Sequence, residues 1–168
     1  VVKNIVIDHL QAIIAKLREA GAFIYSDNNS LKVIGPKKIN AIEMIQTLPY
    51  PGFPTDMQAQ MMALLSIGNG TSIISETVFE NRFKHAEELI RMGANIKTFG
   101  KVAIIKGVKN LTGAKTTAKD LRGGACLVLA GLAAKGITEI ENIYHIERGY
   151  ENIHTELKSL GADINIVE

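Results

Sequence analysis

Three copies of one phrase decide the fold of this chain: LREAGAFI at residues 17–24, LIRMGANI at residues 89–96 and LKSLGADI at residues 157–164. Each copy ends a run in which apolar residues recur three and four positions apart, which indicates an amphipathic helix. The glycine stands where a helix commonly ends in a left-handed residue. Because an apolar segment follows it, the sequence predicts a helix–glycine–strand unit that occurs three times, about 70 residues apart.

A second pattern lies between these copies. Asp56 precedes a helical run at residues 57–66, and Asp120 precedes another at residues 121–134. An aspartate at a helix start is a common N-cap or first-turn residue. Each run is followed by a glycine and then by a segment typical of a strand. The sequence therefore predicts two further helices, each leading into a strand.

Hairpin signals complete the predicted unit. Residues 22–34 and 95–106 each hold two strand-like runs around a short turn, whereas residues 164–168 offer one strand of such a pair. The unit reads strand, helix, strand, helix, strand, strand, so the fold class is α/β with repeated βαβαββ units and mixed sheets. We expect residues 1–168 to form one domain. The abrupt start at Val1 and the absent last strand favour an incomplete piece of a longer protein.

Composition excludes several classes of protein. Hydrophobic residues make up 46% and charged residues 21% of the 168 residues, and the net charge is +2, which rules out a disordered chain. The apolar stretches are shorter than the roughly 20 residues of a membrane span. The near-even charge and the absence of a basic aromatic patch predict no nucleic-acid partner. One cysteine and four widely spaced histidines predict no metal.

The loop LPYPGFPTD at residues 48–56 is the most informative segment for function. Three prolines and a glycine hold its backbone and remove donors. The loop delivers Asp56 to the start of a helix. From the residues alone, the carboxylate could cap that helix, or it could bind a hydroxyl group and accept its proton.

Three arginines are candidates for binding an anion. Arg82 and Arg148 are predicted at strand-to-helix turns in equivalent places of the repeat, and Arg122 in the first helical turn after Asp120. A guanidinium is a bidentate donor for carboxylate or phosphate, and a helix N-terminus adds free N–H groups. The arginines therefore suggest a small polyanionic ligand. The alternative is that each arginine pairs with the acidic residue near it in the sequence.

The remaining candidates are weaker. Cys126 lies on an apolar helical face, so we expect a buried thiol rather than a nucleophile. His85 and His154 lie in polar helical turns, where we expect them to be solvated or capping. His145 is the histidine nearest to Arg148 in the sequence.

Four strings carry a resemblance to a known family: YPGFPTDMQAQ at residues 50–60, ENRF at 80–83, DLR at 120–122 and YHIERGYE at 144–151. They resemble the UDP-N-acetylglucosamine 1-carboxyvinyltransferase family, the enolpyruvyl transferases that open bacterial peptidoglycan synthesis. The resemblance runs the length of the chain. It implies two similar domains of three α/β units each, with helices inside and sheets outside, an inside-out α/β barrel. This chain would be the carboxyl-terminal part of such a two-domain parent.

The resemblance also implies roles for particular residues. Asp56 is similar to the aspartate that contacts the sugar 3-hydroxyl and is the proposed catalytic base. Val78 matches a position that touches the UDP-sugar. Arg148 resembles an arginine that binds phosphoenolpyruvate, and Arg122 and Arg82 belong to the supporting anion-binding set.

The implied substrates are UDP-N-acetylglucosamine and phosphoenolpyruvate, with no cofactor and no metal, in a cytoplasmic enzyme. The reactive-cysteine loop and a lysine of the family belong to the missing N-terminal portion, and Cys126 does not match that loop. We therefore expect the isolated chain to be inactive. Two alternatives stay open: the shikimate-pathway enolpyruvyl transferase, and a non-catalytic module that binds a ligand or packs against other parts.

Overall fold

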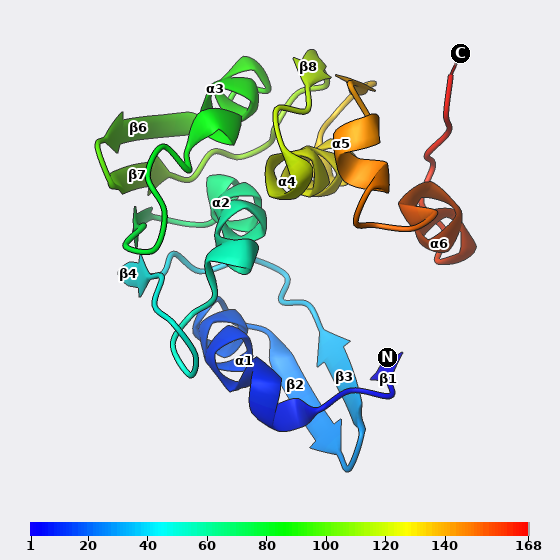
Figure 1. Ribbon diagram of the computed structural model, residues 1–168. Helices are drawn as coiled ribbons and strands as arrows, with labels where there is room; N and C mark the ends of the chain where they lie inside the picture. Colours follow the sequence, from blue (N-terminus) through cyan, green and yellow to red (C-terminus); the bar gives the residue numbers. More distant parts are fainter. Residues whose placement is uncertain (168) are drawn as a thin grey trace.

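The computed structural model describes residues 1–167 (Figure 1). Its first part is a three-stranded antiparallel sheet of order β1-β3-β2, against which one helix packs. The elements are β1 (Val2–Lys3), the 3-10 helix η1 (Ile7–Leu10), α1 (Gln11–Glu19), β2 (Phe23–Asp27) and β3 (Ser30–Ile34). The hairpin predicted at residues 22–34 is confirmed.

The second part contains the whole predicted unit. Its elements are β4 (Met44–Gln46), the 3-10 helix η2 (Thr55–Met57), α2 (Gln58–Ser66), β5 (Thr71–Ser75), α3 (Lys84–Arg91), β6 (Asn95–Phe99) and β7 (Val102–Lys106). The sheet has the order β4-β5-β7-β6; β4 and β5 run parallel and the other pairs antiparallel. The βαβαββ order and the mixed sheet are therefore confirmed.

The third part ends differently from the prediction. Its elements are β8 (Lys115–Thr117), α4 (Leu121–Ala133), β9 (Glu139–Glu141), the one-turn helix α5 (Tyr144–Glu147) and α6 (Ile153–Ser159). Strands β8 and β9 form a parallel pair. The prediction of a strand at residues 164–168 is wrong for residues 164–167, because these residues pair with no strand. Residue 168 lies outside the described part.

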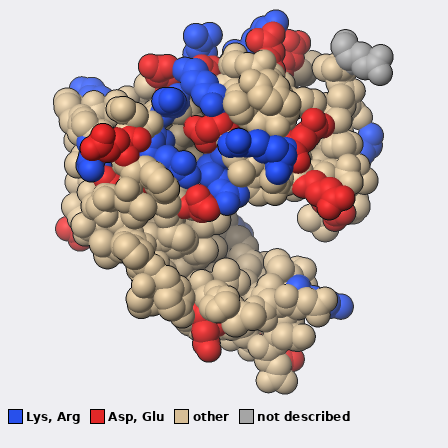
Figure 2. Space-filling model, in the orientation of Figure 1, with Lys and Arg blue, Asp and Glu red and all other residues tan. Residues whose placement is uncertain are grey.

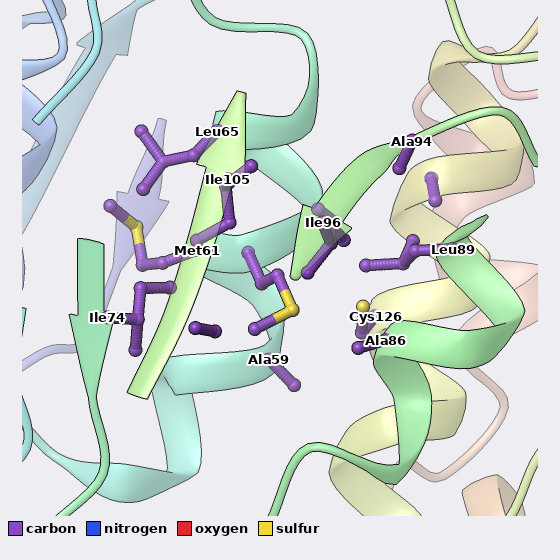
Figure 3. Packing of buried hydrophobic residues seen from close by; sticks show 14 of the residues in the cluster. Ala59, Met61, Leu65, Ile74, Ala86, Leu89, Ala94, Ile96, Ile105 and Cys126 are labelled. Atoms are coloured by element: carbon purple, nitrogen blue, oxygen red, sulfur yellow. The ribbon is translucent and has the colours of Figure 1, made fainter. Parts of the chain in front are cut away.

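The core lies between helices and sheets. Helix α2 buries eight of its nine residues, and α4 packs alongside it in the middle of the molecule (Figure 1). Figure 3 shows how Met61 and Leu65 of α2, Leu89 of α3 and Cys126 of α4 meet the inward side chains of the second sheet, such as Ile105. Helices α2 and α4 thus lie inside and the strands outside, as the resemblance implied. The three sheets of residues 1–167 stay separate and close no barrel.

The repeated glycines have the predicted conformation. Gly21, Gly93 and Gly161 follow α1, α3 and α6 with φ angles of 101°, 88° and 96°, in the left-handed region that favours glycine. Each lets the chain leave its outer helix after one tight turn. The repeated phrase therefore marks a helix that ends in a left-handed glycine three times, and a strand follows directly in the first two copies.

Candidate active site

The proline loop delivers Asp56 to the 3-10 helix η2, directly before α2. The loop is closed by hydrogen bonds from Leu48 N to Phe53 O at 2.9 Å and from Gly52 N to Pro49 O at 2.8 Å. The Asp56 side chain caps neither η2 nor α2. The capping interpretation of Asp56 is therefore wrong, and its carboxylate is free for other contacts.

Two arginines hold the Asp56 carboxylate. Arg82 Nη2 lies 3.1 Å from Oδ1, and Arg122 Nη2 lies 2.6 Å from Oδ2. The side chain of Asp56 is 52% exposed, whereas those of Arg82 and Arg122 are 23% and 27% exposed. The hydrogen bond from Arg122 lowers the pKa of Asp56 below its ordinary value. Partial burial acts in the opposite direction, and the charges of both arginines lower the pKa further.

The partners of these arginines differ from the sequence-based alternative. Neither Arg82 nor Arg122 pairs with its acidic neighbour in the sequence, Glu80 or Asp120, because both guanidiniums reach Asp56 instead. Arg82 lies between β5 and α3, and Arg122 lies in the first turn of α4, as predicted. Asp120 is the N-cap of α4 and accepts a hydrogen bond from Gly123 N at 2.8 Å.

Further side chains support the two guanidiniums. Tyr150 Oη accepts a hydrogen bond from Arg122 Nη1 at 3.0 Å, and its ring lies under the same guanidinium at 5.5 Å. Gln60 Nε2 lies 3.1 Å from Tyr150 Oη. Arg82 lies over the ring of the half-exposed Phe79 at 5.1 Å. These contacts hold both arginines at the start of α2.

Val78 lies in the loop between β5 and α3 that also carries Arg82. Its residue is 40% exposed, and its backbone N–H donates to Glu76 Oε1 at 2.9 Å. The loop follows β5, whereas Asp56 lies in the connection that follows β4. Because β4 and β5 are parallel neighbours, both connections leave the same edge of the sheet.

Arg148 is placed differently from the prediction. It is the C-cap of the one-turn helix α5, so it lies at a helix end and not at a strand-to-helix turn. It is exposed, and it forms no hydrogen bond or ion pair through its side chain with residues 1–167, including Glu147. Its near neighbour Tyr150 contacts Arg122, and Gly149 packs against Leu121 so closely that a Cβ would lie 2.8 Å from Leu121 Cδ2. The segment that carries Arg148 thus lies beside the start of α4.

Two groups near these helices are buried. Cys126 is fully buried and burial raises the pKa of its thiol, which confirms the expected structural role. His85 is 3% exposed, so the expectation of a solvated or capping histidine is wrong. It lies on the inward face of the strongly amphipathic α3, and burial lowers its pKa to about 4.

Charged groups of both signs gather around this region. Figure 2 shows Lys and Arg side chains interleaved with Asp and Glu on the face that carries α2, α3 and α4, beside an open hollow in the molecule. In the part of the chain that the structure describes, no group of three or more His, Cys, Asp or Glu side chains is placed to hold a metal ion. The same residues include no helix of the length and apolarity that crossing a membrane requires.

Three residues of this region had no assigned role in the sequence: Gln60, Glu76 and Tyr150. Gln60 and Tyr150 lie inside the strings that carry the family resemblance, and Glu76 is the charged residue that directly follows the strand at residues 71–75. These positions in the sequence were the only signal that could have marked the three residues as part of the site. Their contacts with residues far away in the sequence could not be read from it.

Comparison with known sequences identifies the family of this chain. The family model EPSP synthase (3-phosphoshikimate 1-carboxyvinyltransferase) matches residues 1–157. The chain is 55% identical, over 94% of its length, to UDP-N-acetylglucosamine 1-carboxyvinyltransferase 2 of Caldanaerobacter subterraneus subsp. tengcongensis. It is 57% identical, again over 94% of its length, to UDP-N-acetylglucosamine 1-carboxyvinyltransferase 1 of Clostridium perfringens.

A solved structure shows the same fold. The enolpyruvyl transferase NikO from Streptomyces tendae superimposes with a TM-score of 0.84 at 28% identity, over 93% of this chain and 36% of that one. The chain spans 38% of the length of the two curated relatives named above. On the match to the family model over residues 1–157, the chain belongs to the EPSP synthase (3-phosphoshikimate 1-carboxyvinyltransferase) family of enolpyruvyl transferases.

Proposed function

We propose that this chain is the carboxyl-terminal part of a longer enzyme that transfers the enolpyruvyl group of phosphoenolpyruvate to the 3-hydroxyl of UDP-N-acetylglucosamine. That reaction is the first committed step of peptidoglycan synthesis. The observation that carries the proposal is the carboxylate of Asp56 held between Arg82 and Arg122. A proton acceptor and anion-binding groups at one place are what an enolpyruvyl transfer needs.

The reaction adds the sugar O–H across the double bond of phosphoenolpyruvate and then eliminates phosphate. The sugar oxygen bonds to C2 while the methylene carbon gains a proton. Loss of phosphate from C2 and of a proton from the new methyl group then restores the double bond. Asp56 accepts the hydroxyl proton. Arg148, Arg122 and Arg82 bind the carboxylate and phosphate, whose charge grows as phosphate leaves, and Val78 contacts the UDP-sugar.

The contacts of Asp56 suggest how substrate binding activates it. A carboxylate held by two guanidiniums is a weak base, because both charges favour its ionised form. An incoming dianion competes for Arg122 and Arg82. Its arrival loosens their hold on Asp56 and raises the pKa of the carboxyl group, so the base gains strength when its substrate is present.

The rest of the longer protein supplies what this chain lacks. Its curated relatives are about two and a half times as long, and the implied reactive-cysteine loop and lysine have no counterpart in these residues. We therefore propose a two-domain cytoplasmic enzyme in which residues 1–168 form one incomplete domain. The chain alone binds anions but turns over no substrate.

A second candidate is the shikimate-pathway enzyme, since the matching family model carries that description. The relatives at 55% and 57% identity favour the UDP-sugar instead. Phosphate release by the full-length protein, measured with phosphoenolpyruvate and either acceptor, tests the choice. We expect release with UDP-N-acetylglucosamine and none with shikimate 3-phosphate. Release with shikimate 3-phosphate alone would overturn the proposal, and binding of the UDP-sugar without release would leave a non-catalytic module.

A further inference from the structure

Glu76 is a buried carboxylate to which the proposed reaction gives no role. It stands directly after β5, and its residue is 1% exposed. No Lys, Arg or His of residues 1–167 forms an ion pair with it. Burying a carboxylate without a cation is costly unless hydrogen bonds replace its water. The donors around Glu76 therefore define what this side chain does.

Four donors surround the carboxylate, and they come from two loops. Oε1 accepts hydrogen bonds from Thr47 Oγ1 at 2.8 Å, Val78 N at 2.9 Å and Phe79 N at 3.1 Å. Oε2 accepts one from Thr55 Oγ1 at 2.9 Å. We call these five residues the Glu76 cluster.

The cluster joins the two segments that carry the candidate site. Thr47 and Thr55 belong to the connection after β4, and Thr55 directly precedes Asp56. Val78 and Phe79 belong to the connection after β5, which continues to Arg82. A single side chain thus touches the segment of the proposed base and the segment of the proposed UDP-sugar contact.

We propose that Glu76 is a positioning residue that holds the Asp56 loop and the Val78 loop in one relative geometry. The inference rests on the proposed function, because it takes Asp56 and Val78 as the groups that meet substrate. An apolar side chain of similar volume would fill the space but would leave the four donors without an acceptor. The carboxylate adds direction, since Oε2 orients Thr55 beside Asp56 while Oε1 orients the amides of Val78 and Phe79.

Thr55→Val tests one half of the cluster in the full-length protein. Valine has nearly the volume of threonine but cannot donate to Oε2. We expect kcat to fall about tenfold, while the Kd for UDP-N-acetylglucosamine stays within about twofold. Hydrogen exchange should rise in residues 48–57 but not in residues 76–83. Thr55→Ser restores the donor and should recover kcat. Thr98→Val, at an exposed residue of β6, serves as the matched control.

Glu76→Gln tests the coupling between the two halves. The amide can still reach every partner if its nitrogen donates to Thr55 Oγ1, but the charge that strengthens the bonds to the amides of Val78 and Phe79 is lost. We expect faster hydrogen exchange in both loops, a Kd for UDP-N-acetylglucosamine about tenfold weaker and a lower kcat. Glu43→Gln, an exposed glutamate beside β4, is the matched control.

Three results would overturn the proposal: parental kcat in Thr55→Val, no recovery in Thr55→Ser, or faster exchange in only one loop of Glu76→Gln. If the unsubstituted protein transfers no enolpyruvyl group, the proposed function fails. In that case the hydrogen-exchange patterns of the two variants alone decide whether Glu76 couples the loops.

Discussion

Replacing Asp56 with asparagine separates the ion pairs that its carboxylate forms from its proposed role as the catalytic base. Asparagine keeps the shape and one oxygen acceptor, but it loses the charge and the ability to take a proton. Asp56 caps no helix and contacts Arg82 at 3.1 Å and Arg122 at 2.6 Å. The contribution of Asp56 to folding stability therefore comes from two partly exposed ion pairs, whereas its proposed contribution to turnover is to accept a proton.

The two effects differ in size. Exposed ion pairs contribute about 0.2–1 kcal/mol each, and the half-exposed position of Asp56 favours the low end of that range. Because the amide oxygen can still accept from one arginine, we expect a loss of at most about 1 kcal/mol in the free energy of unfolding. Removing a general base lowers turnover about 10²–10⁴-fold, which corresponds to about 2.7–5.5 kcal/mol of activation free energy.

The assay compares both quantities in the full-length protein. Phosphate release gives kcat, and urea unfolding gives the free energy of unfolding, with Asp27→Asn at the exposed end of β2 as the control. The lowered pKa of Asp56 means that its contribution to stability is present above its ordinary value of 3.8 and is lost as the pH falls through the lower folded value. A parental kcat together with a lower melting temperature would make Asp56 an ion-pair partner and refute its role as the base.

Three further predictions follow from individual side chains. Arg148→Lys keeps the charge but loses the bidentate donor, so kcat/KM for phosphoenolpyruvate should fall by about one to two orders of magnitude. The fall should be larger than in Arg82→Lys, and a parental kcat/KM would show that Arg148 does not belong to the site. His85 is neutral in the folded chain with a pKa of about 4 against an ordinary 6.5, so its contribution is present above pH 6.5 and is lost as the pH falls toward 4. Between pH 7 and pH 5 the chain should lose about 2 kcal/mol in urea unfolding, His85→Gln should remove most of that dependence, and an equal slope in both proteins would contradict the burial argument. Cys126 should resist alkylation by iodoacetamide in the native chain, because its buried thiol has a raised pKa; an adduct found by mass spectrometry under native conditions would show that α4 opens.

Local patterns in the sequence predicted much of the fold. The glycines that end α1, α3 and α6, the N-cap Asp120 and the two hairpins are all consequences of residues close together in the chain. Backbone conformation and helix capping depend on such near neighbours, so these predictions held. The predicted strand at residues 164–168 failed because a strand also needs a partner, and residues 164–167 have none.

The candidate site was predicted in its members but not in its contacts. Asp56, Arg82 and Arg122 were candidates from residue type and position, yet each was also given a local partner or a capping role that proved wrong. His85 shows the same limit. The polar residues around it in the sequence suggested solvent, but α3 turns that position toward the core.

By itself, the sequence determined the repeat, the α/β class, the glycine turns and the residue types that could bind an anion and accept a proton. Only the tertiary structure decided which of these residues meet. Asp56 lies 26 residues from Arg82 and 66 from Arg122, and their contact exists because β5 and α4 place both arginines beside the start of α2. Glu76 likewise gained its partners from the parallel pairing of β4 with β5. Charges attract over a few ångströms of space, and the distance between two side chains in a folded chain is set by packing rather than by their separation in sequence.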